Sequence, residues 1–144
     1  MASQRHILRS IVVQTVFAWE FHGGEPETIL SYNLVNGAKG TVDQAYALTL
    51  LQKLVKHHKK IRSTIEKYAP EWPWEKIAAV DRAVLEVAVA ELLFEEEVPA
   101  LVAINEAIEL AKEFGNESSS KFINGVLSSL YDDTKSKKSR STSK

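Results

Sequence analysis

Near the C-terminal end of the chain, polar residues lead directly into a lysine and an aromatic ring. Asn116 is followed by serines at 118–120 and then by Lys121 and Phe122. We expect Asn116 to cap a helix, which leaves backbone N–H groups beside the hydroxyls and the ammonium group. Such N–H groups bind phosphate, and an aromatic ring can stack on a base. The chemistry predicted for Ser118, Lys121 and Phe122 is therefore non-covalent binding of a nucleic acid.

Phe122 also has a purely structural interpretation, because most phenylalanines on amphipathic helices are buried in the core. Ile123, Val126 and Leu127 follow at positions that can supply the buried face of the same helix. We therefore expect Phe122 to face outward, and we keep burial in the core as the alternative.

The start of the chain carries a second cluster of cationic side chains. Arg5, His6 and Arg9 all precede the first acidic residue of the chain. Ser3 can cap a helix that begins here, which would place the three side chains on its first turns. Cations grouped in this way bind the phosphates of a nucleic acid, although an ordinary solvated helix start is the simpler interpretation.

Patterns typical of catalysis, cofactor binding or metal binding do not stand out. The sequence contains neither a phosphate-binding glycine loop nor a nucleophile elbow. It has no cysteine, which excludes disulfides and cysteine-bound zinc. His57 and His58 are adjacent and point about 100° apart on a helix, so they make a poor metal pair. We expect no enzymatic activity, no cofactor and no metal.

Helices must position these candidate residues, since apolar residues recur at helical spacing and no segment alternates like a strand. Gly115 is expected to end one helix in the left-handed conformation, and Asp81 is expected to cap another at its N-terminus. About seven helices are predicted, at residues 4–21, 27–36, 41–56, 59–68, 81–95, 99–114 and 117–131.

Two prolines and two tryptophans between residues 70 and 74 mark a stiff connection. The sequence therefore predicts one all-α domain over residues 1–134, made of two small packed bundles at about 1–69 and 74–134. Residues 135–144 contain no apolar side chain, so they should form a disordered basic tail.

Charge is distributed very unevenly, although the formal net charge is only −1. Residues 1–67 hold nine Lys or Arg and five Asp or Glu, whereas residues 68–134 hold four and fourteen. A basic half suits a polyanion and an acidic half suits a basic protein, with solvated faces as the alternative. Neither a membrane span nor a secretory signal is evident, so we expect a cytoplasmic protein.

Three separated segments resemble the NusB family of bacterial transcription antitermination factors. The strongest match is VAINEAIELAKEFG at 102–115 together with KFINGVL at 121–127, which is similar to the C-terminal signature of the family. VDRAVLEVAVAELL at 80–93 resembles its central helix, and VQTVFAWEF at 13–21 resembles its N-terminal helix. The resemblance covers residues 4–131 and implies two packed helical bundles.

The resemblance implies an adaptor that binds a boxA-type single-stranded RNA in ribosomal RNA leader transcripts. Its partner would be the small-subunit ribosomal protein NusE, and the pair would join the RNA polymerase complex. The positions that match RNA contacts of the family are Arg5, His6, Arg9, Ser118, Lys121 and Phe122. The positions near the NusE contact are Phe17, Phe21, Glu75 and Asp81. Ser118 stands where many relatives carry Asp, which puts an acid-dependent base contact in doubt.

Three alternatives stay open. The chain could be a helical protein–protein interaction module without specific RNA binding. It could also be an RNA-targeting domain related to that of ribosomal RNA cytosine methyltransferases, although 144 residues leave no room for their nucleotide-binding domain. Some family members self-associate, so a homodimer is a further possibility.

Overall fold

Seven α-helices and one short 3-10 helix form the computed structural model, which describes residues 3–38 and 43–142, with side chains through residue 135. These residues contain no strand, so the predicted all-α fold is confirmed. The elements are α1 (Gln4–His22), α2 (Pro26–Gly37), α3 (Gln44–Lys56), α4 (His58–Tyr68), η1 (Trp74–Lys76), α5 (Ala79–Phe94), α6 (Ala100–Phe114) and α7 (Glu117–Thr142). No helix in the described ranges combines the length and apolar character that crossing a membrane requires.

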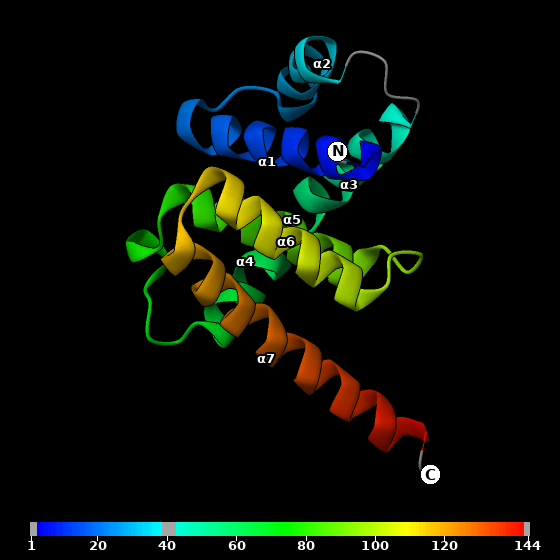
Figure 1. Ribbon diagram of the computed structural model, residues 1–144, viewed down its shortest axis with the longest axis vertical. Coiled ribbons are helices and arrows are strands. Elements are labelled where there is room, and N and C mark those ends of the chain that lie inside the picture. The colour runs from blue at the N-terminus through cyan, green and yellow to red at the C-terminus, as the bar shows by residue number, and fades with distance from the viewer. Residues whose placement is uncertain (1–2, 39–42, 143–144) are drawn as a thin grey trace.

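Helix α5 is the centre of the molecule. It packs against α1, α3, α4, α6 and α7, and every residue from 83 to 91 is buried. Figure 1 shows α1 and α2 at the top of the view, α5 and α6 across the middle, and α7 below them. A helix buried on all sides is mostly apolar all round, as in the VLEVAVA run within α5, which only Glu86 interrupts.

Helix α4 packs mainly with helices of the second half of the chain. The stiff connection at 70–74 suggested that α4 belongs with the first bundle. In the structure α4 packs chiefly on α5 and α7, with Ile61 and Ile65 fully buried. We infer from this packing that the two bundles divide near His57, between α3 and α4.

Two local predictions at helix N-termini are confirmed. Ser3 Oγ accepts a hydrogen bond from the His6 N–H at 3.1 Å, and Asn116 Oδ1 accepts one from the Ser119 N–H at 3.0 Å. Asp81, in contrast, is not an N-cap. Helix α5 begins at Ala79, so Asp81 lies inside its first turn.

The predicted left-handed conformation of Gly115 is also wrong, since its φ is −119°. Glycine is needed there for space. A Cβ atom on Gly115 would lie 2.6 Å from Ser119 Oγ and 2.9 Å from the Ala111 carbonyl oxygen. The close approach of α7 to the end of α6 therefore explains why position 115 is a glycine. The sequence had suggested a left-handed turn as the reason.

The last helix is longer than the apolar pattern, which ends at Tyr131. Helix α7 continues to Thr142 and runs out beyond the other helices (Figure 1). No Gly or Pro follows Gly125, and lysines near a helix C-terminus interact favourably with the helix dipole. The predicted helix end near 131 is therefore wrong. A polar helix without packing is marginal in water, so disorder of residues 135–144 in solution stays a prediction.

Candidate nucleic-acid and partner interface

The exposed cation at the N-terminal end is Arg5. Its guanidinium carbon lies 3.7 Å from the centroid of the Tyr46 ring, and its Nη2 lies 2.8 Å from Asp43 Oδ2. Both partners of this ion pair are nearly half exposed. Exposed ion pairs contribute little to stability, so a phosphate could replace Asp43 at low cost.

His6 is held by two acidic side chains of α6. Its Nδ1 lies 2.7 Å from Glu106 Oε2, and its Nε2 lies 2.9 Å from Glu113 Oε2. Burial opposes protonation of His6, but the hydrogen bonds to both carboxylates outweigh it and raise the pKa of the imidazole. Because Glu113 is in the last turn of α6, the N-terminal end lies beside the turn that leads into residues 118–122.

Arg9 is not on the surface where the sequence places it. Its side chain is 5% exposed, and its Nε lies 2.9 Å from both carboxylate oxygens of Glu91 on α5. Tyr46 donates its hydroxyl to the same carboxylate. Burial foremost raises the pKa of Tyr46, which keeps this donor protonated. An RNA contact by Arg9 would require the buried ion pair to open, so we leave Arg9 out of the interface.

We call residues 118–122 the 118–122 corner, and three of them line a cavity of about 310 Å³ where α7 begins. Ser118 and Phe122 contribute to its wall, together with Trp72 from the connection before η1. The Phe122 and Trp72 rings meet edge to face, with centroids 6.1 Å apart. Lys121 is exposed and lines the neighbouring cavity, whose wall also includes both rings. Phe122 is half-buried, so its ring lies at the margin between the core and this surface.

Asp81 lies in the wall of the same cavity as Ser118 and Phe122. The resemblance assigned Asp81 to the protein partner and the other two residues to RNA. Asp81 is nearly buried, and its Oδ1 accepts no hydrogen bond within the described part of the chain. A buried acceptor without a partner is costly, so a donor from a ligand would be well placed here.

The remaining candidates for partner binding lie apart from this cavity. Phe17 and Phe21 stack at the end of α1 with centroids 6.1 Å apart, and Phe21 is 73% exposed. Glu75 is exposed on η1. An exposed ring such as Phe21 is typical of a protein interface. Phe17 is half-buried and lines a cavity together with Val80, which precedes Asp81 in the chain.

Sequence reasoning missed Trp72, Tyr46 and one group of possible metal ligands. Trp72 is 51% exposed and reaches Phe122 across 50 residues of sequence, so no local pattern could reveal the pair. The possible ligands are Glu20, His58 and Glu86, which come from three different helices.

These features define a small helical binding protein whose surface combines cations with exposed aromatic rings. A family model described as the NusB family matches residues 6–132. The chain therefore belongs to the NusB family, as its three segments suggested.

Individual relatives agree with this assignment. A protein of Dehalococcoides mccartyi (strain CBDB1) named transcription antitermination protein NusB is 38% identical over 130 residues, which cover 90% of this chain and 91% of the relative. A solved structure of NusB from T. maritima has a TM-score of 0.79 and 34% identity, covering 90% of this chain and 92% of that chain. A solved structure of the antitermination factors NusB and NusE in complex with dsRNA has a TM-score of 0.83 and 27% identity, covering 92% and 99%.

Proposed function

We propose that this chain is a non-enzymatic transcription antitermination adaptor of the cytoplasm. It binds a boxA-like RNA of ribosomal RNA leader transcripts together with NusE, and the pair joins the RNA polymerase complex. Membership of the NusB family supports the role, and the related complex of NusB, NusE and dsRNA supports both partners. The observation that carries the RNA contact is the ring pair of Trp72 and Phe122 beside Ser118 at the start of α7.

The 118–122 corner offers RNA two kinds of contact. The N–H groups of Glu117 and Ser118 precede the one that Asn116 caps, so together with the Ser118 hydroxyl they can hold a phosphate. Lys121 adds a positive charge close by. Phe122 presents a ring on which an unpaired base can stack, and we therefore commit to single-stranded RNA.

The N-terminal cluster supplies the second part of the RNA surface. Arg5 is exposed and exchanges Asp43 for a phosphate, whereas His6 remains held by the carboxylates of α6. The hydrogen bond from His6 to Glu113 keeps this cluster next to the end of α6, so one RNA strand can reach both places. Arg9 fixes α1 on α5 and acts only through this positioning.

The protein partner binds through the aromatic pair of α1 and the acidic side chains of the second bundle. Phe21 is the most exposed of these rings and serves as the anchor that enters a pocket of NusE. Glu75 and Asp81 pair with basic side chains of NusE. Because Asp81 shares a cavity with Phe122, the protein and RNA contacts adjoin one another.

Binding of a labelled boxA-type RNA tests this function. The controls are a scrambled strand of equal length and a boxA duplex, each measured with and without NusE at near-physiological salt. We expect the single-stranded boxA RNA to bind best and NusE to strengthen only that binding. Equal weak binding of all three RNAs, without a gain from NusE, would reject the adaptor function and leave a helical protein–protein module.

A further inference from the structure

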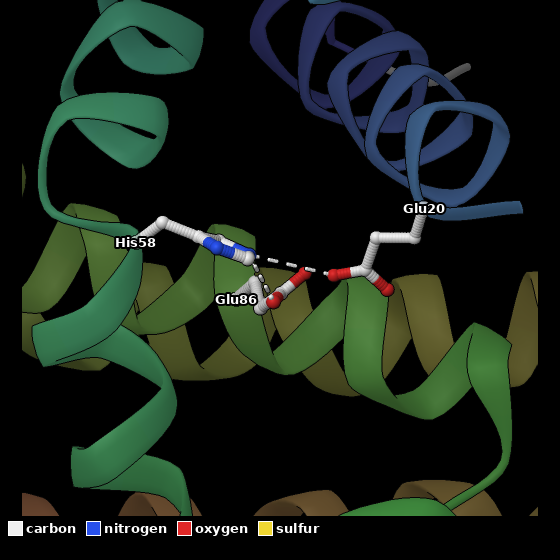
Figure 2. A group of neighbouring side chains, drawn as sticks. All are labelled: Glu20, His58 and Glu86. Atoms are coloured by element: carbon white, nitrogen blue, oxygen red, sulfur yellow. Dashed lines mark hydrogen bonds and ion pairs between the residues drawn. The ribbon is translucent and has the colours of Figure 1, made fainter. Parts of the chain in front are cut away.

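Three side chains from three helices converge where α1, α4 and α5 meet (Figure 2). Glu20 comes from the end of α1, His58 begins α4, and Glu86 lies in the middle of α5. His58 Nε2 lies 3.0 Å from Glu86 Oε1 and 3.6 Å from Glu20 Oε1. One ligand atom of each residue lies within 4.8 Å of the others, and no second group in the described ranges meets this condition. We call these residues the carboxylate–histidine cluster.

The cluster places two carboxylates against each other in a poorly hydrated position. The Glu86 side chain is 0% exposed, and its Oε2 accepts no hydrogen bond from a described residue. A buried carboxylate oxygen without a partner, beside a second carboxylate, is costly, so this geometry favours a cation at the cluster.

Among the described residues, Arg82 is the only other charged side chain that contacts the cluster. It does not neutralise Glu86. Its Nε lies 4.0 Å from Glu20 Oε2, on the side of that carboxylate away from His58. Its Nη1 donates instead to the backbone carbonyls of Trp74 and Ile77, at 3.2 and 2.8 Å. The unpartnered Glu86 oxygen is therefore left for a cation that enters the cluster itself.

We infer that Glu20, His58 and Glu86 bind a divalent transition-metal ion, and that Zn²⁺ is the ion they suit best. Zinc bonds of about 2.0–2.1 Å at tetrahedral angles separate neighbouring ligand atoms by about 3.3 Å. The observed separations of 3.0 and 3.6 Å bracket this value. An imidazole nitrogen favours zinc over magnesium or calcium, and two carboxylates balance its charge. Three protein ligands leave a fourth position for water.

A metal ion here would join the two bundles, because Glu20 belongs to the first bundle while His58 and Glu86 belong to the second. A metal ion would enter the cluster from the side of His58, because this ring is one-third exposed and the Glu86 side chain is fully buried. Such an ion binds the folded state only, so it raises the unfolding temperature.

The test uses the full chain after treatment with a chelator and dialysis. At a slightly alkaline pH, which favours displacement of ligand protons by the metal, Zn²⁺ at about a hundred times its Kd should raise the unfolding temperature by roughly 5–10 °C. Mg²⁺ should leave it unchanged. Co²⁺ should give the visible absorption of a tetrahedral complex at one equivalent per chain.

The variant Glu86→Gln keeps the size of the side chain and removes one ligand charge, so it should fold and lose both responses. His6→Gln is the matched control. His6 also lies between two carboxylates, but it contacts Glu106 and Glu113 through different ring nitrogens, so no single ion can bind all three. This control should respond to Zn²⁺ and Co²⁺ like the unmodified chain.

Two results would overturn the metal site. One is a chain whose unfolding temperature and cobalt spectrum do not respond to the ions. The other is a Glu86→Gln variant that responds fully, because the ions would then bind elsewhere, for example at His22 or His57. Should Glu86→Gln fail to fold, His58→Gln carries the same test, since its side chain is partly exposed.

Discussion

Arg9 Nε and both carboxylate oxygens of Glu91 are 2.9 Å apart, inside the core between α1 and α5. The pair joins the first bundle to the central helix, and the Tyr46 hydroxyl completes the coordination of the carboxylate. A residue that resembles an RNA contact in sequence is therefore part of the scaffold that orients Arg5 and His6.

Replacing Arg9 by Ala should destabilise the fold by about 3–5 kcal/mol, because Glu91 would remain buried without its partner. Urea unfolding measures this loss. The control is Arg5→Ala, whose exposed ion pair should contribute within about 1 kcal/mol. If Arg9→Ala kept its stability and lost only RNA affinity, the scaffold role would be refuted.

Phe122→Ala should weaken binding of boxA-type RNA by about 1–3 kcal/mol, because one base loses its stacking platform. Its ring is only half-buried, so the accompanying loss of stability should be smaller than the roughly 2–5 kcal/mol typical of a core truncation. A fluorescence titration and a thermal melt give the two quantities.

Phe21→Ala is the matched aromatic control, because Phe21 is exposed at the other surface. It should weaken the affinity for NusE and leave RNA binding in the absence of NusE unchanged. A Phe122→Ala variant that binds RNA normally and melts far lower would place this ring in the core.

Lys121→Ala should lower the dependence of RNA affinity on salt. Each phosphate contact on a single strand contributes about 0.7 to the slope of log K against log salt, so the slope should fall by about that amount. Lys59→Ala serves as the control, since Lys59 is exposed on α4 outside both proposed RNA contacts. Equal slopes for Lys121→Ala and the unmodified chain would argue against a phosphate at this position.

Stability should depend on pH through His6. Its pKa is raised in the folded state, so the protonated imidazole pairs with Glu106 and Glu113 and contributes fully below the unfolded value near 6.5. This contribution is lost as the pH rises through the folded pKa. Arg9 also faces this group, with Nη1 3.9 Å from Glu106 Oε2, and it stays charged throughout.

Unfolding free energies of the unmodified chain and His6→Gln, measured from pH 6 to pH 9, isolate the contribution of His6. The difference between the two should shrink as the pH rises. A difference that is constant over this window, or that grows, would mean that His6 does not gain its proton on folding.

Most helices and the caps Ser3 and Asn116 were predictable because their signals are local. Both caps act on the chain three residues ahead, and helical spacing marks each buried face. A local signal also misled at Asp81, since α5 already begins at Ala79. The conformation of Gly115 was not predictable from its neighbours in sequence, because the approach of Ser119 explains this residue.

The candidate site was predicted less completely for the same reason. Ser118 and Phe122 form a surface with Trp72 and Asp81, which are distant in sequence. Arg9 resembles an exposed cation until Glu91, 82 residues away, is placed beside it. No spacing rule relates such pairs, so only the three-dimensional arrangement separates a binding residue from a structural one.

The most direct test of the adaptor function is the affinity of this chain for NusE, measured by calorimetry with and without saturating boxA-type RNA. Coupling between two binding sites is reciprocal, so RNA should strengthen NusE binding by the same factor by which NusE strengthens RNA binding. The scrambled strand should have no effect. NusE affinity that is identical with and without boxA-type RNA would contradict the adaptor function and leave a protein-binding module.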